Sequence, residues 1–300
     1  MKALVFGSLN IDYVYRVPHF VAKGETLSSF SLEKYCGGKG LNQAVALSRA
    51  GMDTWMAGAV GEDGDFLLEE LRSAGVDTSL VCRGTIPTGH AIIQNSPDGD
   101  NAIVLFGGAN RSVTKEQAQE VLRHFARGDL LLLQNEISSL QAIVSLARER
   151  GMRIALNPSP MDAPLIRELL KDVDLLLLNR VEAAQLLGEE SGTAESRLEK
   201  LHEEYPEITI VLTLGEDGSL LRGKDLKLRQ RAFPVRAVDT TGAGDTFTGF
   251  FLASLLQSSD AARALRCAAA AAALAVTRPG AAPSIPRLDE VLRMLEGEES

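Results

Sequence analysis

The sequence is poor in cysteine, and its cysteines form no recognisable pattern. Of the 300 residues only Cys36, Cys82 and Cys267 are cysteines, and they lie far apart with no CxxC pair and no neighbouring histidines. A disulfide framework or a zinc site would need closer, paired spacing. We therefore expect the protein to work in a reducing compartment, the cytoplasm.

Long apolar runs are also missing. The longest strongly apolar helical stretch, 267–276, has ten residues and is mostly alanine, whereas a membrane-spanning helix needs roughly 20 residues. Residues 1–7 pass into a short apolar run that ends at Gly7, without the core or cleavage site of a signal peptide. We expect neither a membrane span nor export.

Clustered positive charge is absent as well. The formal net charge is −9, and no run of five or more Lys or Arg residues occurs, so a nucleic acid is not an expected partner. An anion such as ATP remains possible, because backbone N–H groups at a helix N-terminus can hold phosphate inside an acidic protein.

Two common nucleotide-binding motifs do not occur. The glycines before Lys39 lack the spacing of a Walker A loop and the Ser or Thr that follows its lysine, which disfavours a P-loop NTPase. Gly7 starts no GxGxxG, and Gly58, Gly61 and Gly64 have the wrong spacing for a dinucleotide site.

Runs of branched apolar residues alternate with helical patterns along the chain. The continuous runs predict strands at 3–6, 55–60, 130–133, 153–156, 175–178 and 208–212. Helices are predicted at 41–50, 63–74, 114–126, 137–150, 162–171, 180–187, 193–204, 243–257, 260–276 and 287–296. This alternation predicts a doubly wound α/β fold with a mostly parallel sheet.

Two segments break this alternation. They cover about 13–35 and 88–105, and the second contains Ser-Pro-Asp-Gly-Asp at 96–100, a hairpin-turn signal. We expect them to form a small β-sheet that acts as a lid, inserted in a single domain of residues 1–300.

The strongest chemical signal is Asp-Thr-Thr-Gly-Ala-Gly-Asp at 239–245, where a turn becomes a helix. Gly242, Ala243 and Gly244 would let backbone N–H groups approach a phosphate, and the helix start adds positive potential. Asp245, in the first helical turn, would accept the proton of an attacking hydroxyl. The alternative is a glycine-rich turn followed by an ordinary first-turn acid.

Two other polar segments lie beside predicted elements. In Gly-Gly-Lys-Gly-Leu-Asn-Gln at 37–43, Lys39 and Asn42 could donate to a polyhydroxylated ligand, or the segment could be a flexible turn. Asn10 and Asp12 follow the first strand and could bind vicinal hydroxyls there, or simply form Asx turns.

Taken together, these motifs resemble the ribokinase-like (PfkB) carbohydrate kinase family. The resemblance spans nearly the whole chain, and it is the joint order of the motifs that makes it specific. The matching segments are 7–12, 37–46, 107–110, 156–160, 179–182, 213–218, 239–245 and 275–281.

The resemblance implies a three-layer α/β/α sandwich with a β-sheet lid, often a dimer through the lids. It implies an ATP-dependent kinase, with Mg²⁺ and K⁺, that phosphorylates a primary hydroxyl of a free sugar. D-ribose, giving ribose 5-phosphate, is the expected acceptor.

The same resemblance assigns the site residues. For the sugar they are Asn10, Asp12, Gly38, Lys39, Asn42, Glu136 and Asp245. For the nucleotide and its magnesium they are Asn179, Glu182, Thr213, Gly215, Gly218 and Gly244. For a monovalent cation they are Asp239, Thr241, Ala275, Arg278, Gly280 and Ser284.

Two alternatives on the same fold stay open. A nucleoside kinase would use lid aromatics, and the chain offers Tyr13, Tyr15, Phe20 and Phe30. A sugar-phosphate kinase shares the glycine motifs, but two carboxylates, Asp12 and Glu136, would repel a phosphate dianion.

Overall fold

The branched apolar runs of the sequence form one central sheet in the computed structural model, which describes residues 1–98 and 100–297. Its strand order is β13-β12-β11-β10-β9-β8-β1-β4-β5, and the strands are parallel except at the β11-β12-β13 edge. The strands are β1 Ala3–Phe6, β4 Thr54–Val60, β5 Asp77–Arg83, β8 Leu130–Gln134, β9 Arg153–Asn157, β10 Leu175–Asn179, β11 Thr209–Thr213, β12 Ser219–Gly223 and β13 Leu226–Gln230.

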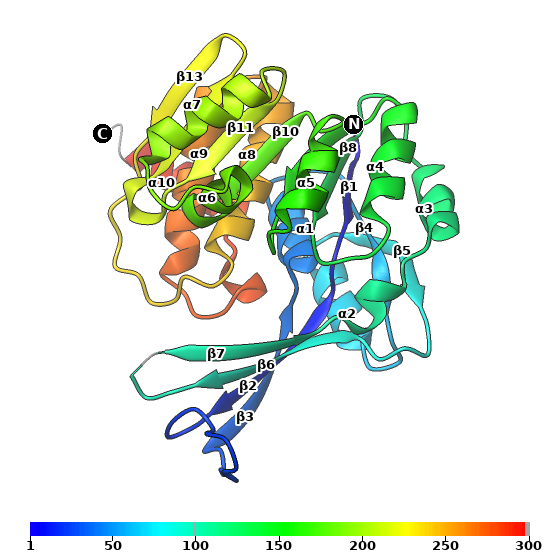
Figure 1. Cartoon of the computed structure of the whole chain (residues 1–300), viewed down its shortest axis with the longest axis vertical. Helices are drawn as coiled ribbons and strands as arrows, with labels where there is room; N and C mark the ends of the chain where they lie inside the picture. The colour runs from blue at the N-terminus through cyan, green and yellow to red at the C-terminus, as the bar shows by residue number, and fades with distance from the viewer. Residues whose placement is uncertain (99, 298–300) are drawn as a thin grey trace.

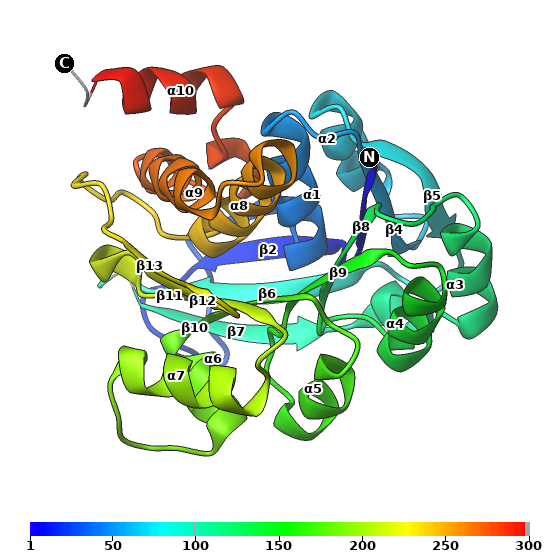
Figure 2. The same cartoon turned by 90° about the horizontal axis from the view of Figure 1, so that it is seen from above.

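Helices cover both faces of this sheet (Figure 2). One layer holds α1 Lys39–Arg49, α2 Asp65–Ser73, α8 Ala243–Ser258, α9 Ala261–Val276 and α10 Leu288–Gly297. The other holds α3 Lys115–Leu122, α4 Leu140–Glu149, α5 Ala163–Leu170, α6 Arg180–Leu187 and α7 Ala194–Glu204. Short 3-10 helices are η1 Gly108–Ser112, η2 Gly215–Asp217 and η3 Ala282–Ser284.

Side chains along β1 show why continuous apolar runs were needed. Ala3 and Val5 belong to the core under α1 and α8, whereas Leu4 and Phe6 belong to the core under α3 and α4. Successive side chains of a strand point to opposite faces, so a strand covered on both faces must be apolar throughout. The predicted fold class, α/β layers with a mostly parallel sheet, is confirmed.

The strand order changes direction between β1 and β8, which are neighbours in the sheet. From β1 the following strands, β4 and β5, extend toward one edge, whereas from β8 the following strands, beginning with β9, extend toward the other edge. Ligands of open α/β sheets bind beyond the carboxyl ends of the strands at such a switch point. Here that point lies beyond Phe6 and Gln134, the last residues of β1 and β8.

A four-stranded sheet projects from the main body next to this switch point (Figure 1). Its order is β3-β2-β6-β7, with β2 Asn10–Arg16, β3 Ser31–Gly37, β6 Gly89–Asn95 and β7 Asn101–Phe106. The predicted hairpin joins β6 to β7, and the Ser96 N–H donates to the Asp100 carbonyl at 3.0 Å. Gly99 of the predicted turn lies outside the described residues.

The structure corrects several predicted elements. β3, β5, β12 and β13 were not predicted as strands, because each mixes polar and apolar residues near an edge of its sheet. The helix predicted from 137 begins only at Leu140. Ser139 has a left-handed φ of 63°, and the hydroxyls of Ser138 and Ser139 both donate to the Val113 carbonyl, which delays the helix.

Within residues 1–98 and 100–297, no helix combines the length and apolarity needed to cross a membrane.

Candidate active site

Two helices begin beside each other at the centre of the candidate site. Asp245 lies in the first turn of α8 and is only 8% exposed. Its Oδ2 accepts a hydrogen bond from Asn42 Nδ2 at 3.0 Å, and its Oδ1 accepts one from Gln43 Nε2 at 2.8 Å. The two donors are successive residues near the start of α1. Close packing of α8 on α1 therefore fixes both oxygens of the carboxylate.

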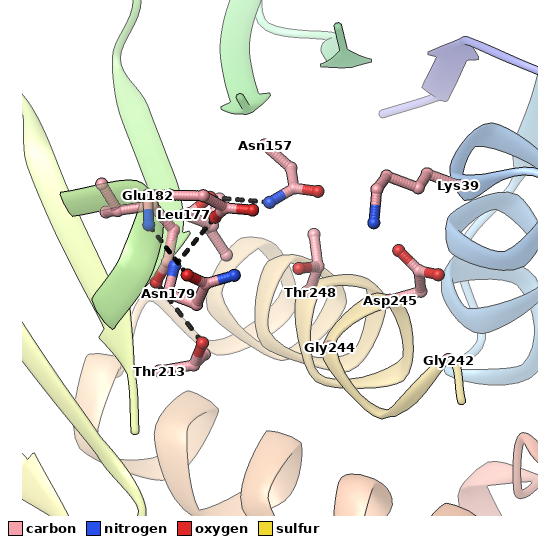
Figure 3. A pocket seen from close by; sticks show the side chains of 11 residues that line it. Lys39, Asn157, Leu177, Asn179, Glu182, Thr213, Gly242, Gly244, Asp245 and Thr248 are labelled. Carbon is pink, nitrogen blue, oxygen red and sulfur yellow. Dashed lines mark hydrogen bonds between the residues drawn. The ribbon is translucent and has the colours of Figure 1, made fainter. Parts of the chain in front are cut away.

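A pocket opens in front of this carboxylate (Figure 3). Its lining residues are Lys39, Asn157, Leu177, Leu178, Asn179, Glu182, Thr213, Gly242, Gly244, Asp245 and Thr248. They come from α1, α6 and α8 and from the carboxyl ends of β9, β10 and β11. The structure thus brings together predicted sugar, nucleotide and catalytic residues from segments more than 200 positions apart.

The start of α8 has the features of an anion site. Gly242 precedes the helix with a left-handed φ of 74° and caps it with no side chain. A Cβ on Gly244 would meet no atom within 4 Å, so this backbone faces open space in the pocket. N–H groups without a helical partner and the helix dipole favour a negative group at such a place. Ala243 is the first residue of the helix, and its N–H donates to the Thr240 carbonyl at 3.3 Å.

A second cluster of polar residues lies where the four-stranded sheet, the predicted lid, joins the main sheet. Asn10 and Asp12 lie in β2, not in turns, and Asn10 Oδ1 accepts from Asn110 Nδ2 at 2.7 Å. Glu136 Oε2 accepts from the Ser8 hydroxyl and, at 3.2 Å, from the Lys39 N–H. Gly38 has a φ of 93°, and a Cβ there would lie 2.9 Å from the Asn10 nitrogen. The predicted sugar residues are therefore neighbours.

Two titratable groups near this cluster, Asp12 and Lys39, have raised pKa values. Burial, with the nearby Glu136 carboxylate adding to it, raises the pKa of Asp12 from 3.8 to about 7. The Asp245 carboxylate raises the pKa of Lys39 against the effect of burial, and Glu136 and Glu182 add to that rise. Lys39, whose side chain points toward Asp245 (Figure 3), therefore stays charged at neutral pH.

Asn179 and Glu182 form the start of α6. The Asn179 side chain accepts from the Val181 and Glu182 N–H groups, and Glu182 Oε2 accepts from the Asn179 N–H at 2.9 Å. This is a capping box. Glu182 is nonetheless 8% exposed and lines the pocket, so the second oxygen of its carboxylate is available to the pocket.

Thr213 is the last residue of β11 and lines the pocket, while Gly215 and Gly218 follow in the loop around η2. Gly218 has a φ of 91°, and a Cβ there would lie 2.0 Å from the Gln230 carbonyl oxygen. These two glycines are not among the residues that line the pocket. They shape the turn beside it.

The loop residues before α8 form a separate cluster. Asp239 Oδ1 accepts from the N–H and the hydroxyl of Thr241 at 2.9 and 2.7 Å, and its Oδ2 accepts from the Gly280 N–H at 2.8 Å. Burial pushes the Asp239 pKa up, but these hydrogen bonds outweigh it and hold the pKa below its usual value. Asp239 thus joins the loop before α8 to the loop after α9.

The other predicted cation residues lie in or near that second loop. Ala275 is in the last turn of α9, and its carbonyl accepts from the Arg278 N–H at 3.1 Å. The Arg278 guanidinium pairs with Glu290 of α10. Ser284, 1% exposed, donates its hydroxyl hydrogen to the Ala281 carbonyl at 2.8 Å.

Sequence reasoning missed several polar residues of the site. Ser8, Gln43, Asn110, Gln134 and Asn157 all hydrogen-bond within it. Four of these five lie inside or beside the quoted motifs, but none looked exceptional by type or spacing. The one available signal was a polar residue at or just beyond the end of an apolar run, as for Gln134 and Asn157.

An open helix start with a carboxylate in its first turn, beyond the carboxyl ends of the strands of an α/β sheet, suits phosphoryl transfer. Residues 1–288 match the model of the pfkB family carbohydrate kinases. The chain is 36% identical to the ribokinase of Haemophilus influenzae over 302 residues, covering 97% of each protein.

Ribokinases are also among the similar solved structures. The Arabidopsis thaliana ribokinase complexed with ribose and ATP aligns with a TM-score of 0.89 at 31% identity, covering 98% of each chain. The ribokinase of Cryptococcus neoformans var. grubii in complex with ADP aligns at 0.87 and 34% identity, covering 98% of this chain and 99% of that one. The chain belongs to the pfkB family of carbohydrate kinases, phosphotransferases with an alcohol acceptor, as its motifs predicted.

The raised pKa of Asp12 predicts how stability depends on pH. A carboxyl group that holds its proton more tightly in the folded state stabilises the fold below its unfolded pKa of 3.8, and this contribution is lost as the pH rises through about 7. We expect Asp12→Asn to raise the melting temperature relative to wild type more at pH 8 than at pH 5. Thermal unfolding at both pH values measures this.

Asp98→Asn, an exposed carboxylate of the same lid, is the matched control and should show no such difference. Equal effects of Asp12→Asn at pH 5 and pH 8 would contradict the predicted pKa.

Proposed function

We propose that this chain transfers the γ-phosphoryl group of ATP to a primary hydroxyl of a free sugar, D-ribose, giving ribose 5-phosphate. One observation carries this proposal. The Asp245 carboxylate lies in the first turn of a helix whose start is open to the pocket, so a base stands beside an anion site. The names and complexes of the similar ribokinases support ribose and ATP as the substrates.

In the proposed reaction, Asp245 accepts the proton of the sugar hydroxyl as its oxygen attacks the γ-phosphorus. The bond between that phosphorus and the β,γ-bridging oxygen breaks, and ADP leaves. The N–H groups at the start of α8 face the negative charge on the transferring group. Lys39 supplies a positive charge on the same side of the pocket.

Glu182 and Asn179 fit a supporting role for Mg²⁺. Mg²⁺ usually keeps several waters and binds through one or two carboxylates and the substrate phosphates. Glu182 offers one carboxylate oxygen to the pocket, and Asn179 lines the pocket beside it. When bound, the ion would neutralise phosphate charge, and these two residues would hold its waters.

The acceptor end of the site favours hydroxyls over phosphate. Glu136 offers an acceptor, Asp12 accepts when it is ionised, and the Asn42 Oδ1 is buried with no partner among the described residues. Such acceptors suit a ligand with several O–H donors. A sugar phosphate would bring a dianion toward Glu136 and the ionised form of Asp12, which is unfavourable.

Several of the lid aromatics that a nucleoside kinase would use are turned away from Asp12. In the regular register of β2, Asp12 points to one face of the lid and Tyr13 and Tyr15 to the other. Tyr13 packs edge-on against His90 on that other face. Phe30 lies outside the paired core of the lid and is 71% exposed. Tyr13, Tyr15 and Phe30 are therefore poorly placed to stack on a base beside Asp12, whereas Tyr35, the partner of Asp12 across β2 and β3, shares its face.

The proposal is tested by measuring ADP release with Mg·ATP over a panel of pentoses, hexoses, nucleosides and sugar phosphates. We expect the highest kcat/KM with D-ribose. A higher kcat/KM with a fructose phosphate or a nucleoside would overturn the assignment of the acceptor.

Asp245→Asn tests the base. The substitution keeps the size of the side chain but removes the proton acceptor, so we expect kcat to fall by on the order of 100-fold or more. Folding and ribose binding should be retained, as checked by thermal unfolding and calorimetry. Turnover close to the wild-type rate would remove Asp245 from the mechanism.

We further propose that K⁺ binds between the two loops joined by Asp239. The predicted donors there are oxygens, namely the Asp239 carboxylate, backbone carbonyls and the Ser284 hydroxyl, and an oxygen-only set fits a hard cation. The nearby guanidinium of Arg278 is neutralised by Glu290. Ordering of this loop would fix the peptide N–H groups of Gly242 and Gly244, which follow directly.

Exchange of K⁺ for a bulky organic cation at constant ionic strength tests this site. We expect a lower kcat or a higher KM for ATP at saturating ribose, because preorganised donors matter most as charge develops. Asp239→Asn should reduce the response to K⁺. Unchanged kinetics after the exchange would reject the cation site and leave Asp239 as a turn-forming residue only.

We also propose a homodimer formed through the lids. The lid is a single layer of strands, and Ile103 and Leu105 of β7, on the same face as Asp12, are 52% and 59% exposed. An isolated thin sheet with an apolar face needs a second layer to be stable. A second lid supplies one.

Light scattering should give a mass twice the 32.2 kDa of the chain. Ile103→Lys should yield monomers, because it places a charge in the contact, while Lys23→Glu in an exposed lid loop should remain dimeric. A monomeric wild-type protein would rule out the lid contact.

We place the protein in the reducing cytoplasm, where its three cysteines, which are unpaired in the structure, would stay as thiols. With a net charge of −9 we expect no nucleic acid partner.

A further inference from the structure

Behind Asp245 lies a row of buried amide side chains. Gln43 is fully buried, and its Nε2 lies 2.8 Å from Asp245 Oδ1 and 3.1 Å from Asn157 Oδ1. Gln43 Oε1 in turn lies 2.6 Å from Nε2 of Gln134, which is also fully buried. Among the described residues, the pocket lining includes neither glutamine. Any effect they have on the reaction must pass through Asp245 or Asn157, the two pocket residues that Gln43 contacts.

The direction of these hydrogen bonds is fixed by chemistry. An ionised carboxylate only accepts, so Gln43 must present its NH₂ group to Asp245 and its carbonyl oxygen to Gln134. Gln134 must then donate. Its own Oε1 is left buried with no partner among the described residues. Turning the Gln134 amide would place two carbonyl oxygens face to face, so the unpaired oxygen is a consequence of holding Gln43 in one orientation.

The backbone around Gln134 makes room for this arrangement. A Cβ on Gly7 would lie 2.1 Å from Gln134 Oε1, so the side chain occupies the space that any larger residue would fill. Gly7 is the first residue after β1, and Gln134 is the last residue of β8. The amide row therefore starts at the switch point of the sheet and ends at Asp245.

We propose that Gln43, oriented by Gln134, is a positioning residue that holds the Asp245 carboxylate in the rotation at which it can accept the proton of the sugar hydroxyl. This proposal rests on the proposed function. Asn42 holds the other carboxylate oxygen from the preceding position of α1, and with both oxygens fixed the carboxylate cannot swing out of reach. A general base must stay within hydrogen-bond distance of the proton that it removes.

Two substitutions separate positioning from packing. Gln43→Glu keeps the size of the side chain but replaces the donor facing Asp245 by an oxygen, whereas Gln43→Leu removes all hydrogen bonds. We expect both to lower kcat by about tenfold or more, with KM for ribose and ATP changed less than about threefold, since misplacing a base affects turnover rather than binding. Gln43→Glu should be at least as slow as Gln43→Leu. A packing role predicts the opposite order.

Ser48→Ala is the matched control on the same helix. It removes one hydrogen bond, from the Ser48 hydroxyl to the Ala74 carbonyl at 2.7 Å, at the far end of α1. It should leave kcat unchanged. Gln134→Leu should lower kcat by a smaller factor than Gln43→Leu and should add little to it in the double variant, because the two act in series.

The Asp245→Asn background decides whether Gln43 acts through the base. There, Gln43→Leu should change the residual rate less than about twofold, because residues that act as a unit are not additive. An equal loss in both backgrounds, or no loss in either, would overturn the proposal.

A crystal structure of Gln43→Glu provides a readout that does not depend on activity. We expect the Asp245 carboxylate to be rotated or divided between positions. An unmoved carboxylate would overturn the positioning role even if the wild-type protein phosphorylates ribose. Conversely, a wild-type protein inactive on the whole panel would refute the proposed function, while the carboxylate position would still decide the role of Gln43.

Discussion

The site depends on the packing of α8 against α1. These helices are almost 200 residues apart in the chain, yet a Cβ on Gly249 of α8 would lie 2.4 Å from Ala46 Cβ of α1. Only a glycine allows so close an approach. Because the helices touch, the first turn of α8 meets the first turn of α1, and Asp245 reaches Asn42 and Gln43. A wider spacing would leave the carboxylate without either donor.

The groups that this packing brings to the pocket explain how an acidic protein can bind an anionic ligand. The net charge of −9 opposes phosphate binding at long range, but contact with a phosphate is decided locally. The open start of α8 and the charged Lys39 face the pocket, while Asp12 and Glu136 lie where the lid joins the main sheet. In the proposed function, this arrangement places the phosphate groups at one end of the site and the sugar at the other.

Much of this could be predicted from the sequence, and the misses have physical causes. Continuous apolar runs revealed the inner strands, because those strands are buried on both faces. The strand β13 escaped because it is an edge strand that carries Lys227 and Arg229, and β12, although mostly buried, has only two successive apolar residues before Arg222. The glycines and Asp245 at the start of α8 could be predicted because their chemistry is local: a tight turn, a helix start and an acid one turn in.

The amide row could not be predicted from the residues alone. A glutamine has no type-specific chemistry, and the meaning of Gln43 arises only when α1, α8 and β8 converge on it. The same convergence explains a feature that stability alone would disfavour. A buried carbonyl oxygen without a partner, as Gln134 has among the residues that the structure describes, is normally avoided in a protein core. Replacing both glutamines by apolar residues would remove that unpaired oxygen but would also remove a donor from Asp245. Its presence therefore fits a site in which the orientation of one carboxylate matters more than the last increment of stability.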